Sequence, residues 1–286
     1  MKKMIVMFVA FVLGLTIFRG AVADSVILMI GDGMGANHIA CAQKDMPLFM
    51  TTLPVKGWIK TRSANQDVTD SAAAATAYAC GQKTNNKFIG KLPNGADCLA
   101  ITEEAVESGK AVGIYSTDHD NGATPAAFYA HAKNRKARKI IQKYRKEAAE
   151  DMDIETSVPE ISDIISGKLK TLAGEADDFF ALFEGGLIDK KSHKNKLQEM
   201  KEELYDFDYS VMKAVRFARK NPDITVLVLA DHECGGLTKE CVFTSDDHTG
   251  VDIPLFAYGK HAKLFEGVQD NTDIYRKMKM ILFTED

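Results

Sequence analysis

The chain has 286 residues, of which 45% are hydrophobic and 27% are charged, and its formal net charge is −4. This composition is typical of an ordinary globular protein and excludes a disordered tail, a collagen-like repeat and a coiled coil. The acidic balance also argues against nucleic-acid binding through the overall field of the protein.

The N-terminal 23 residues have the layout of a secretory signal peptide. Two lysines precede an apolar run over 4–18, and residues 21–23 form a small-x-small cleavage site. The run is short for a membrane span, although an uncleaved anchor helix is the alternative interpretation. Cleavage removes three basic residues and no acid, so the net charge changes from −4 to −7. We therefore expect a periplasmic or secreted protein with one catalytic domain over 24–286 and no stable membrane insertion.

Apolar runs alternate with amphipathic or alanine-rich segments along the mature chain. In chain order we predict strands at 25–30 and 54–61, helices at 71–80 and 99–108, a strand at 111–116, helices at 131–149 and 159–172, a strand at 178–183, a helix over 193–220 broken near residue 206, strands at 224–230 and 253–258, and a helix at 273–282. Uninterrupted apolar strands that alternate with helices indicate a mostly parallel sheet with helices on both faces. The predicted fold class is therefore an α/β three-layer sandwich.

Acids and histidines follow the carboxyl ends of several predicted strands. They are Asp32, Glu184, Asp189, His193, Asp231 and His232, and His248 lies just before the last strand. Each could alone be a turn residue or a cap. Ligands of open α/β sheets bind outside the strand carboxyl ends, so we expect these side chains to converge. Three imidazoles and four carboxylates exceed what one tetrahedral Zn²⁺ takes, which favours two ions and a third, oxygen-rich site.

Ser71 opens the alanine-rich helix predicted at 71–80. A serine there is a normal helix cap, and this structural interpretation is as good as a functional one on spacing alone. In the functional interpretation the helix N-terminus binds a phosphate and metal coordination activates the hydroxyl as a nucleophile.

The five cysteines are an odd number, and export makes disulfides available to them. Cys234 and Cys241 flank a Gly-Gly turn and could pair across a hairpin, and whether they do stays open. Cys41, Cys80 and Cys98 have no clear partner, and we expect at least one of them to be a small buried thiol.

These motifs together resemble the alkaline phosphatase family. The matching segments are Ile-Gly-Asp-Gly-Met-Gly at 30–35, Thr-Asp-Ser-Ala at 69–72, Ala-Thr-Pro-Ala-Ala at 123–127, Glu-Gly-Gly-x-Ile-Asp-Lys-x-x-His at 184–193, Ala-Asp-His at 230–232 and His-Thr-Gly at 248–250, in the order of the family. The resemblance runs from about residue 24 to 261. It implies the alkaline-phosphatase-like fold and metal-dependent hydrolysis of small phosphate monoesters through a phosphoserine.

The resemblance implies a role for each matching residue. Ser71 is the implied nucleophile, and Arg135, oriented by Asp70, is the implied clamp on the phosphate. The implied ligands of the first Zn²⁺ are Asp189, His193 and His248, those of the second are Asp32, Asp231 and His232, and those of a Mg²⁺ are Asp32, Thr124 and Glu184. Lys190 is implied to lie near the third site and to reach the phosphate through water.

Two departures from the family pattern are visible. Many members have an acid or histidine two residues before the Mg²⁺-site threonine, where this chain has Gly122, and Asp120 is the acid we note nearby. The segment between Arg135 and Glu184 is also short, so we expect the chain to lack a strand and an accessory segment of longer members. A more open site follows, and a homodimer is not assured.

Two other functions stay open. A phosphodiesterase of the same superfamily would use similar metal ligands, whereas a sulfatase is disfavoured because no Cys-x-Pro-x-Arg signature is present. A protein that binds metal or phosphate without turnover is the third alternative.

Overall fold

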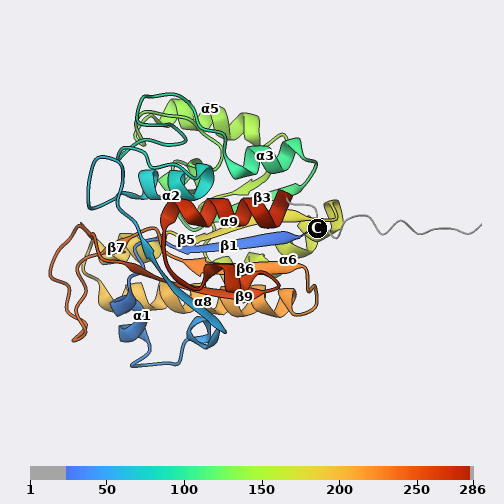
Figure 1. The fold of residues 1–286 in the computed structure, drawn as a ribbon. Coiled ribbons are helices and arrows are strands. Elements are labelled where there is room, and N and C mark those ends of the chain that lie inside the picture. Colours follow the sequence, from blue (N-terminus) through green and yellow to red (C-terminus); the bar gives the residue numbers. More distant parts are fainter. Residues whose placement is uncertain (1–23, 284–286) are drawn as a thin grey trace, which may run out of the picture.

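The computed structural model describes residues 24–283, and the predicted signal peptide lies outside the described residues. An eight-stranded sheet forms the centre (Figure 1). From one edge to the other its strands are β10 (Gly267–Asp270), β2 (Val55–Lys60), β9 (Ile253–Gly259), β6 (Ile224–Leu229), β1 (Ser25–Gly31), β5 (Phe179–Gly185), β3 (Ala111–Ser116) and β4 (Asp153–Glu155).

The sheet is mostly parallel, as predicted. β9 is antiparallel to its neighbours β2 and β6, and the other paired strands run parallel. Every residue of β1, β5 and β6 is buried. These strands are covered on both faces, which is why they are continuous apolar runs.

Helices cover both faces of the sheet. They are α1 (Ala36–Ala42), η1 (Phe49–Thr52), α2 (Ser71–Cys80), α3 (Ile101–Glu107), α4 (Ala123–Ala126), α5 (Arg138–Ala148), α6 (Ile161–Glu175), α7 (Leu187–Ser192), α8 (Leu197–Ala218), η2 (Ala262–Phe265) and α9 (Asn271–Phe283). In Figure 1 α2, α3 and α9 lie on one side of the sheet and α8 lies on the other. α9 packs against β1 and α2, whereas α8 packs against α6 and β6. The three-layer α/β prediction is therefore confirmed. No helix within residues 24–283 is both long and apolar enough to cross a membrane.

The helix predicted at 131–149 is wrong in its first turns, since α5 begins only at Arg138. Ala132 instead pairs with Ile89 in a short antiparallel bridge. The amide of Arg135 donates to the carbonyl of Lys87 at 2.8 Å. These backbone bonds to a distant segment replace helical ones, and they place Arg135 on a loop.

The predicted break near residue 206 is also wrong, because α8 runs without interruption from Leu197 to Ala218. Asp206 instead accepts a hydrogen bond at 3.0 Å from the amide of Ile161, at the start of α6. An acid on one helix thus satisfies a free N–H of another, which is a tertiary role that local propensity does not reveal.

Cys234 and Cys241, whose pairing the sequence left open, are not bonded to each other. Cys41 is bonded to Cys241 and Cys80 to Cys98, and Cys234 is the free, buried cysteine. β7 (Glu233–Cys234) and β8 (His248–Thr249) pair so that Cys234 lies opposite His248. The strand that pairs with Cys234 therefore lies farther along the chain than Cys241, the residue that a tight turn at Gly-Gly would bring near it.

Candidate metal and nucleophile site

Polar residues from adjacent strands meet at the carboxyl edge of the sheet. Asp231 and His232 follow β6, Asp32 follows β1, and Glu184 lies near the end of β5. Ile30 of β1 is in register with Glu184 on one side and with Leu229 on the other. The convergence expected from the sequence is therefore present, and strand order sets the order of the side chains.

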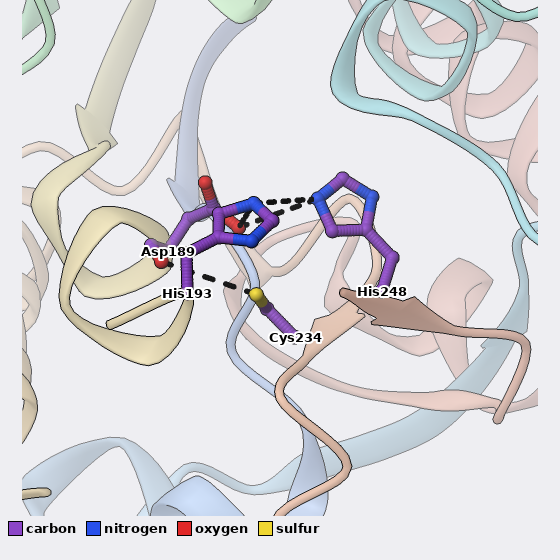
Figure 2. A group of neighbouring side chains, drawn as sticks. All are labelled: Asp189, His193, Cys234 and His248. Atoms are coloured by element: carbon purple, nitrogen blue, oxygen red, sulfur yellow. Dashed lines mark hydrogen bonds and ion pairs between the residues drawn. The ribbon is translucent and has the colours of Figure 1, made fainter. Parts of the chain in front are cut away.

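A first cluster joins Asp189 and His193 of the α7 segment to His248 of β8 (Figure 2). The Nε2 atoms of the two histidines are 3.1 Å apart. Asp189 Oδ1 lies 3.4 Å from Nε2 of His193 and 3.5 Å from Nε2 of His248. Three ligand atoms thus face one point.

The other ring nitrogen of each histidine has a fixed partner. Nδ1 of His193 lies 2.6 Å from the carbonyl of Asp246, and Nδ1 of His248 lies 3.1 Å from the carbonyl of Thr69. A carbonyl only accepts hydrogen bonds, so both Nδ1 atoms are donors. In the neutral rings the Nε2 lone pairs then face each other, which favours a shared cation. A metal-bound histidine usually donates its other N–H to a carbonyl or carboxylate, as both rings do here.

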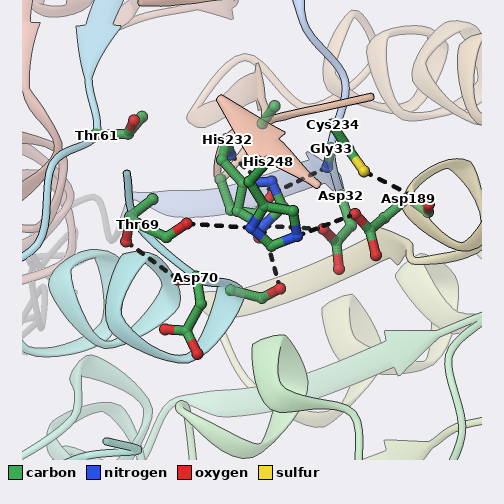
Figure 3. A network of polar contacts seen from close by, with 12 residues as sticks. Asp32, Gly33, Thr61, Thr69, Asp70, Asp189, His232, Cys234 and His248 are labelled. Carbon is green, nitrogen blue, oxygen red and sulfur yellow. Dashed lines mark hydrogen bonds and ion pairs between the residues drawn. The ribbon is translucent and has the colours of Figure 1, made fainter. Parts of the chain in front are cut away.

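A second cluster consists of Asp32, Asp231 and His232, all essentially inaccessible to solvent. Figure 3 shows two of them, Asp32 and His232, with His248 beside them. His232 Nε2 lies 3.1 Å from Asp231 Oδ2 and 3.6 Å from Asp32 Oδ1. The other oxygen of Asp231 accepts from the amides of Gly33 at 3.0 Å and His232 at 2.9 Å. The His232 ring stacks on that of His248 with centroids 3.6 Å apart, so the two clusters adjoin.

Ser71 lies beside the second cluster at the N-terminus of α2. Its Oγ is 3.2 Å from His232 Nε2 and 3.5 Å from Arg135 Nη1. Arg135 also donates to Asp70 Oδ2 at 3.3 Å. Asp70 caps α2 by accepting from the amide of Ala73 at 3.1 Å. Asp70 and not Ser71 is therefore the cap of α2, so the interpretation of Ser71 as the helix cap is wrong; Ser71 is the first residue of the helix.

Glu184, Thr124 and Lys190 lie together at the third position. The Thr124 hydroxyl is near the Glu184 carboxylate without forming a hydrogen bond of good geometry. Lys190 Nζ lies 3.6 Å from Asp189 Oδ2 and 3.4 Å from an oxygen of Asp118. Asp118 was not among the predicted site residues.

Crowded negative charge shifts the pKa values of the carboxyl groups. Burial, followed by the charges of Asp231 and Asp189, raises the pKa of Asp32 well above its ordinary value. Burial and the charge of Asp118 raise the pKa of Glu184 to about 8. For Asp189 burial also acts upward, but the contact with His248 and the positive charges around it leave the pKa lowered.

The donor set fits divalent cations. Buried oxygen atoms without a hydrogen-bond partner among the described residues include Asp32 Oδ1, Thr124 Oγ1, Glu184 Oε1, Asp189 Oδ1 and Asp231 Oδ2. Such atoms are costly unless a partner is supplied. Imidazole and carboxylate in the first two clusters suit Zn²⁺, and the purely oxygen-based third position suits Mg²⁺.

Two features near the clusters were missed from sequence. The Cys234 thiol lies among Asp189, His193 and His248, with the four candidate ligand atoms within 4.8 Å of one another. Burial, then the charge of Asp189, raises its pKa. Its position after the Ala-Asp-His motif could have signalled this proximity.

His38 is the other missed residue, and it contacts Ser192 at the end of α7. Its Nε2 lies 3.1 Å from Ser192 Oγ and its Nδ1 lies 3.9 Å from Glu233. Burial lowers the pKa of His38 to about 4, so the ring is neutral. All three side chains are buried, and no sequence motif marks them as a group.

Comparison with known proteins gives one consistent result. A family model described as alkaline phosphatase matches residues 23–156, 145–243 and 237–284. Alkaline phosphatase 3 of Bacillus subtilis is 28% identical, and the match covers 89% of this chain and 88% of that protein. Alkaline phosphatase 4 of the same organism is also 28% identical, but the match covers 75% of this chain and only 62% of that protein.

A solved structure is similar over almost its whole length. It is a magnesium-bound variant of the alkaline phosphatase of the Antarctic bacterium TAB5, with 26% identity and a TM-score of 0.82. The superposition covers 92% of this chain and 98% of that chain.

Proposed function

The chain belongs to the alkaline phosphatase family, and we propose that it hydrolyses small phosphate monoesters through a phosphoserine on Ser71. The observation that carries this proposal is the position of Ser71 Oγ, 3.2 Å from His232 and 3.5 Å from Arg135. A hydroxyl beside a candidate metal cluster and a guanidinium has an activating group and a phosphate-binding group within reach.

The phosphate would bind between Arg135 and the N-terminus of α2. The Arg135 guanidinium is already oriented by Asp70, and a planar guanidinium can donate to two phosphate oxygens at once. Positive charge from the helix dipole favours the same anion. A monoester dianion benefits from both more than a diester monoanion does.

Ser71 Oγ then attacks phosphorus, the bond from phosphorus to the ester oxygen breaks, and the alcohol leaves. Water cleaves the phosphoserine in a second step, which releases phosphate and restores the hydroxyl. Arg135 stays bound to the phosphoryl oxygens throughout both steps, and burial of Ser71 excludes bulk solvent from its hydroxyl. Burial strengthens these charge interactions because the local dielectric is low.

We propose two Zn²⁺ ions, one held by Asp189, His193 and His248 and one by Asp32, Asp231 and His232, and a Mg²⁺ at Asp32, Thr124 and Glu184. Bound ions of this kind lower the pKa of hydroxyl groups and water and neutralise charge on a transferring phosphoryl group. Lys190, near the third position, would contribute positive charge toward the phosphate through water.

The proposed setting is outside the cytoplasm, in the periplasm or secreted. Two disulfides, Cys41–Cys241 and Cys80–Cys98, support an oxidising compartment. We propose small phosphate monoesters as substrates and no nucleic-acid partner, because the net charge is negative. A homodimer stays a proposal of the family resemblance.

Turnover of p-nitrophenyl phosphate by protein supplied with Zn²⁺ and Mg²⁺ tests the function. We expect Ser71→Ala to lower kcat by about 10³-fold or more, because no other hydroxyl takes its place. Ser210→Ala is the matched control, since Ser210 is a buried serine of α8 whose hydroxyl donates to the carbonyl of Asp206 in the same helix. Mass spectrometry of acid-quenched wild-type protein should find a phosphoryl group on Ser71.

The alternatives predict other outcomes. Faster turnover of bis-p-nitrophenyl phosphate than of the monoester would favour a phosphodiesterase and overturn the proposal. Full activity of Ser71→Ala would disprove the covalent mechanism, and an inactive but metal-loaded wild-type protein would favour the binding function.

A further inference from the structure

Asp118 occupies a space that two glycines leave open. A Cβ added at Gly122 would lie 2.9 Å from Asp118 Oδ2, and one added at Gly186 would lie 2.8 Å from Asp118 Cβ. Gly122 has φ −52°, a value open to any L-residue. Backbone conformation therefore does not require glycine at 122, whereas the neighbouring carboxylate excludes a side chain there.

Asp118 is also held firmly in this space. It follows β3, which lies beside β5 with Ser116 in register with Glu184. Its amide donates to Ser116 Oγ at 2.8 Å, and its carbonyl accepts from the amide of Ser157 at 2.7 Å. Ser116 in turn donates to Glu184. A single set of hydrogen bonds thus fixes Asp118 relative to Glu184.

The carboxylate of Asp118 faces the third position of the site. The residue is only 4% exposed. One oxygen accepts from the amide of His119 at 2.8 Å, and the other lies 3.4 Å from Lys190 Nζ. After burial, the charge of Asp118 is the largest influence that raises the pKa of Glu184.

The neighbouring oxygens lack partners. Thr124 Oγ1 and Glu184 Oε1 are buried and form no hydrogen bond among the described residues. Asp120, the acid closer to Gly122 in sequence, points elsewhere: it accepts from Thr156 at 2.6 Å and pairs with Arg145 at 3.4 Å. Asp118 is instead the acid whose charge acts on Glu184 and whose Oδ2 lies against Gly122, two residues before Thr124.

We propose that Asp118 supplies the third-site carboxylate of this protein, completing with Thr124 and Glu184 an oxygen-only site for Mg²⁺. Asp118 comes from the end of β3, four residues before Gly122. The missing side chain of Gly122 leaves the room that the Asp118 carboxylate needs. Hard divalent ions prefer such oxygen ligands. This inference rests on the proposed third metal of the preceding section.

Calorimetric titration with Mg²⁺ of protein already loaded with Zn²⁺ tests the proposal, with Mn²⁺ and electron paramagnetic resonance as a second readout. Wild-type protein should bind one further ion. Asp118→Asn keeps the shape of the side chain and should weaken that binding by at least about 10-fold, by analogy with the loss of supporting groups at metal sites. Asp120→Asn is the matched control and should bind as wild type does.

A transfer of the carboxylate sharpens the test. Asp118→Ala with Gly122→Asp moves the acid to the space that Asp118 vacates, and we expect it to bind the third ion more tightly than Asp118→Ala alone. Gly122→Asp alone should bind less tightly than wild type, because its Cβ would lie 2.9 Å from an Asp118 oxygen.

Three outcomes would overturn the inference. They are wild-type affinity in Asp118→Asn, an equal loss in Asp120→Asn, and the absence of a third ion in wild-type protein. Hydrolysis of p-nitrophenyl phosphate by the Zn²⁺-loaded protein is measured separately, so a failure of the proposed function is distinguishable from a failure of the Asp118 assignment.

Discussion

The site has two parts that differ in how the fold supports them. We call Asp32, Glu184, Asp231 and His232 the floor; these residues lie at strand ends and are at most 1% exposed. We call Arg135, Lys190, His193 and His248 the rim; they lie on loops, a short helix and a two-stranded ribbon. Side-chain exposure in the rim ranges from 10% for His248 to 36% for His193.

The floor and the rim differ in what holds their side chains in place. Floor carboxylates are placed by the packed sheet, which holds them close together although they repel one another. Rim groups are placed by a few hydrogen bonds, such as those from His248 to Thr69 and from Arg135 to Asp70. Changes to the floor should therefore affect metal binding and stability in opposite directions, and changes to the rim should affect mainly ligand affinity.

Asp32→Asn should give the largest effect. Asp32 belongs to two of the proposed metal sites, so we expect kcat/KM to fall by about 10³-fold. In the presence of a chelator the same change should raise the free energy of unfolding by about 1 to 3 kcal/mol, because it removes a buried carboxyl group whose ionised form is disfavoured by burial and by the charge of Asp231. Urea unfolding measures this, with the exposed Asp252→Asn as control. Lower stability of Asp32→Asn in chelator would contradict the inference that the floor carboxylates repel one another in the metal-free protein.

Removal of the Cys41–Cys241 disulfide tests whether this bond holds the His248 part of the rim in place. The bond joins α1 to the segment that leads to His248, across 200 residues of chain. Replacing both cysteines with serine should cost about 2 to 4 kcal/mol of unfolding free energy and weaken Zn²⁺ binding at the rim. The matched pair is Cys80–Cys98, whose closed loop of 18 residues lies at the end of α2. Its removal should cost about 3 kcal/mol without loss of bound zinc. Equal zinc loss in both variants would contradict a specific role of the Cys41–Cys241 bond in zinc binding at the rim.

The pH dependence of stability should reverse when metal is removed. The pKa of Glu184 is raised from 4.5 to about 8 in the folded protein. Its protonated form is favoured by folding, so the associated stability is complete below pH 4.5 and is lost as pH rises toward 8. We expect a decrease of up to about 5 kcal/mol across this window in chelator, and an increase in protein with bound metal, because protons compete with the ions.

Glu184→Gln should flatten the chelator curve, which assigns the effect to this residue. The lowered pKa values of Asp189 and Asp231 act in a separate window, because their stabilisation is lost only as pH falls below about 3.8. An unchanged slope in Glu184→Gln would place the titration elsewhere.

Arg135→Ala should give the smallest effect, a fall of about 10- to 100-fold in kcat/KM with a weaker inhibition constant for phosphate. Arg135→Lys should recover only part of this, because an ammonium cannot donate to two oxygens in a fixed plane. Stability should be nearly unchanged, since the side chain is about one-quarter exposed. Lys136→Ala is the neighbouring control; the same loss there would mean that general positive charge, and not the clamp, binds phosphate.

Much of the floor was predictable because its signals are local. The strand 25–30 ends in Gly-Asp-Gly, and 224–230 ends in Asp-His. A buried parallel strand must be apolar along its length and must place its polar residues at its end. The structure brings these predicted residues together, and it places Ser71 and Asp70 beside them.

The rim and the third position depended on contacts between distant segments. The basic run over 131–149 has a helical composition, yet its beginning pairs with the segment around Ile89 and places Arg135 on a loop. Asp120 is nearer than Asp118 to Gly122 in sequence, but it turns toward Arg145. The pairing of Cys41 with Cys241 follows from the packing of α1, which no spacing rule contains.

By itself the sequence determined the α/β layers, the order of the strand-end motifs and the identity of nearly every candidate ligand, because hydrophobic periodicity and motif spacing are properties of short segments. Only the tertiary structure decided which acid fills the space beside Gly122, which cysteines join and how the rim is held. Those choices depend on distances of a few ångströms between segments far apart in the chain, and side-chain packing sets such distances.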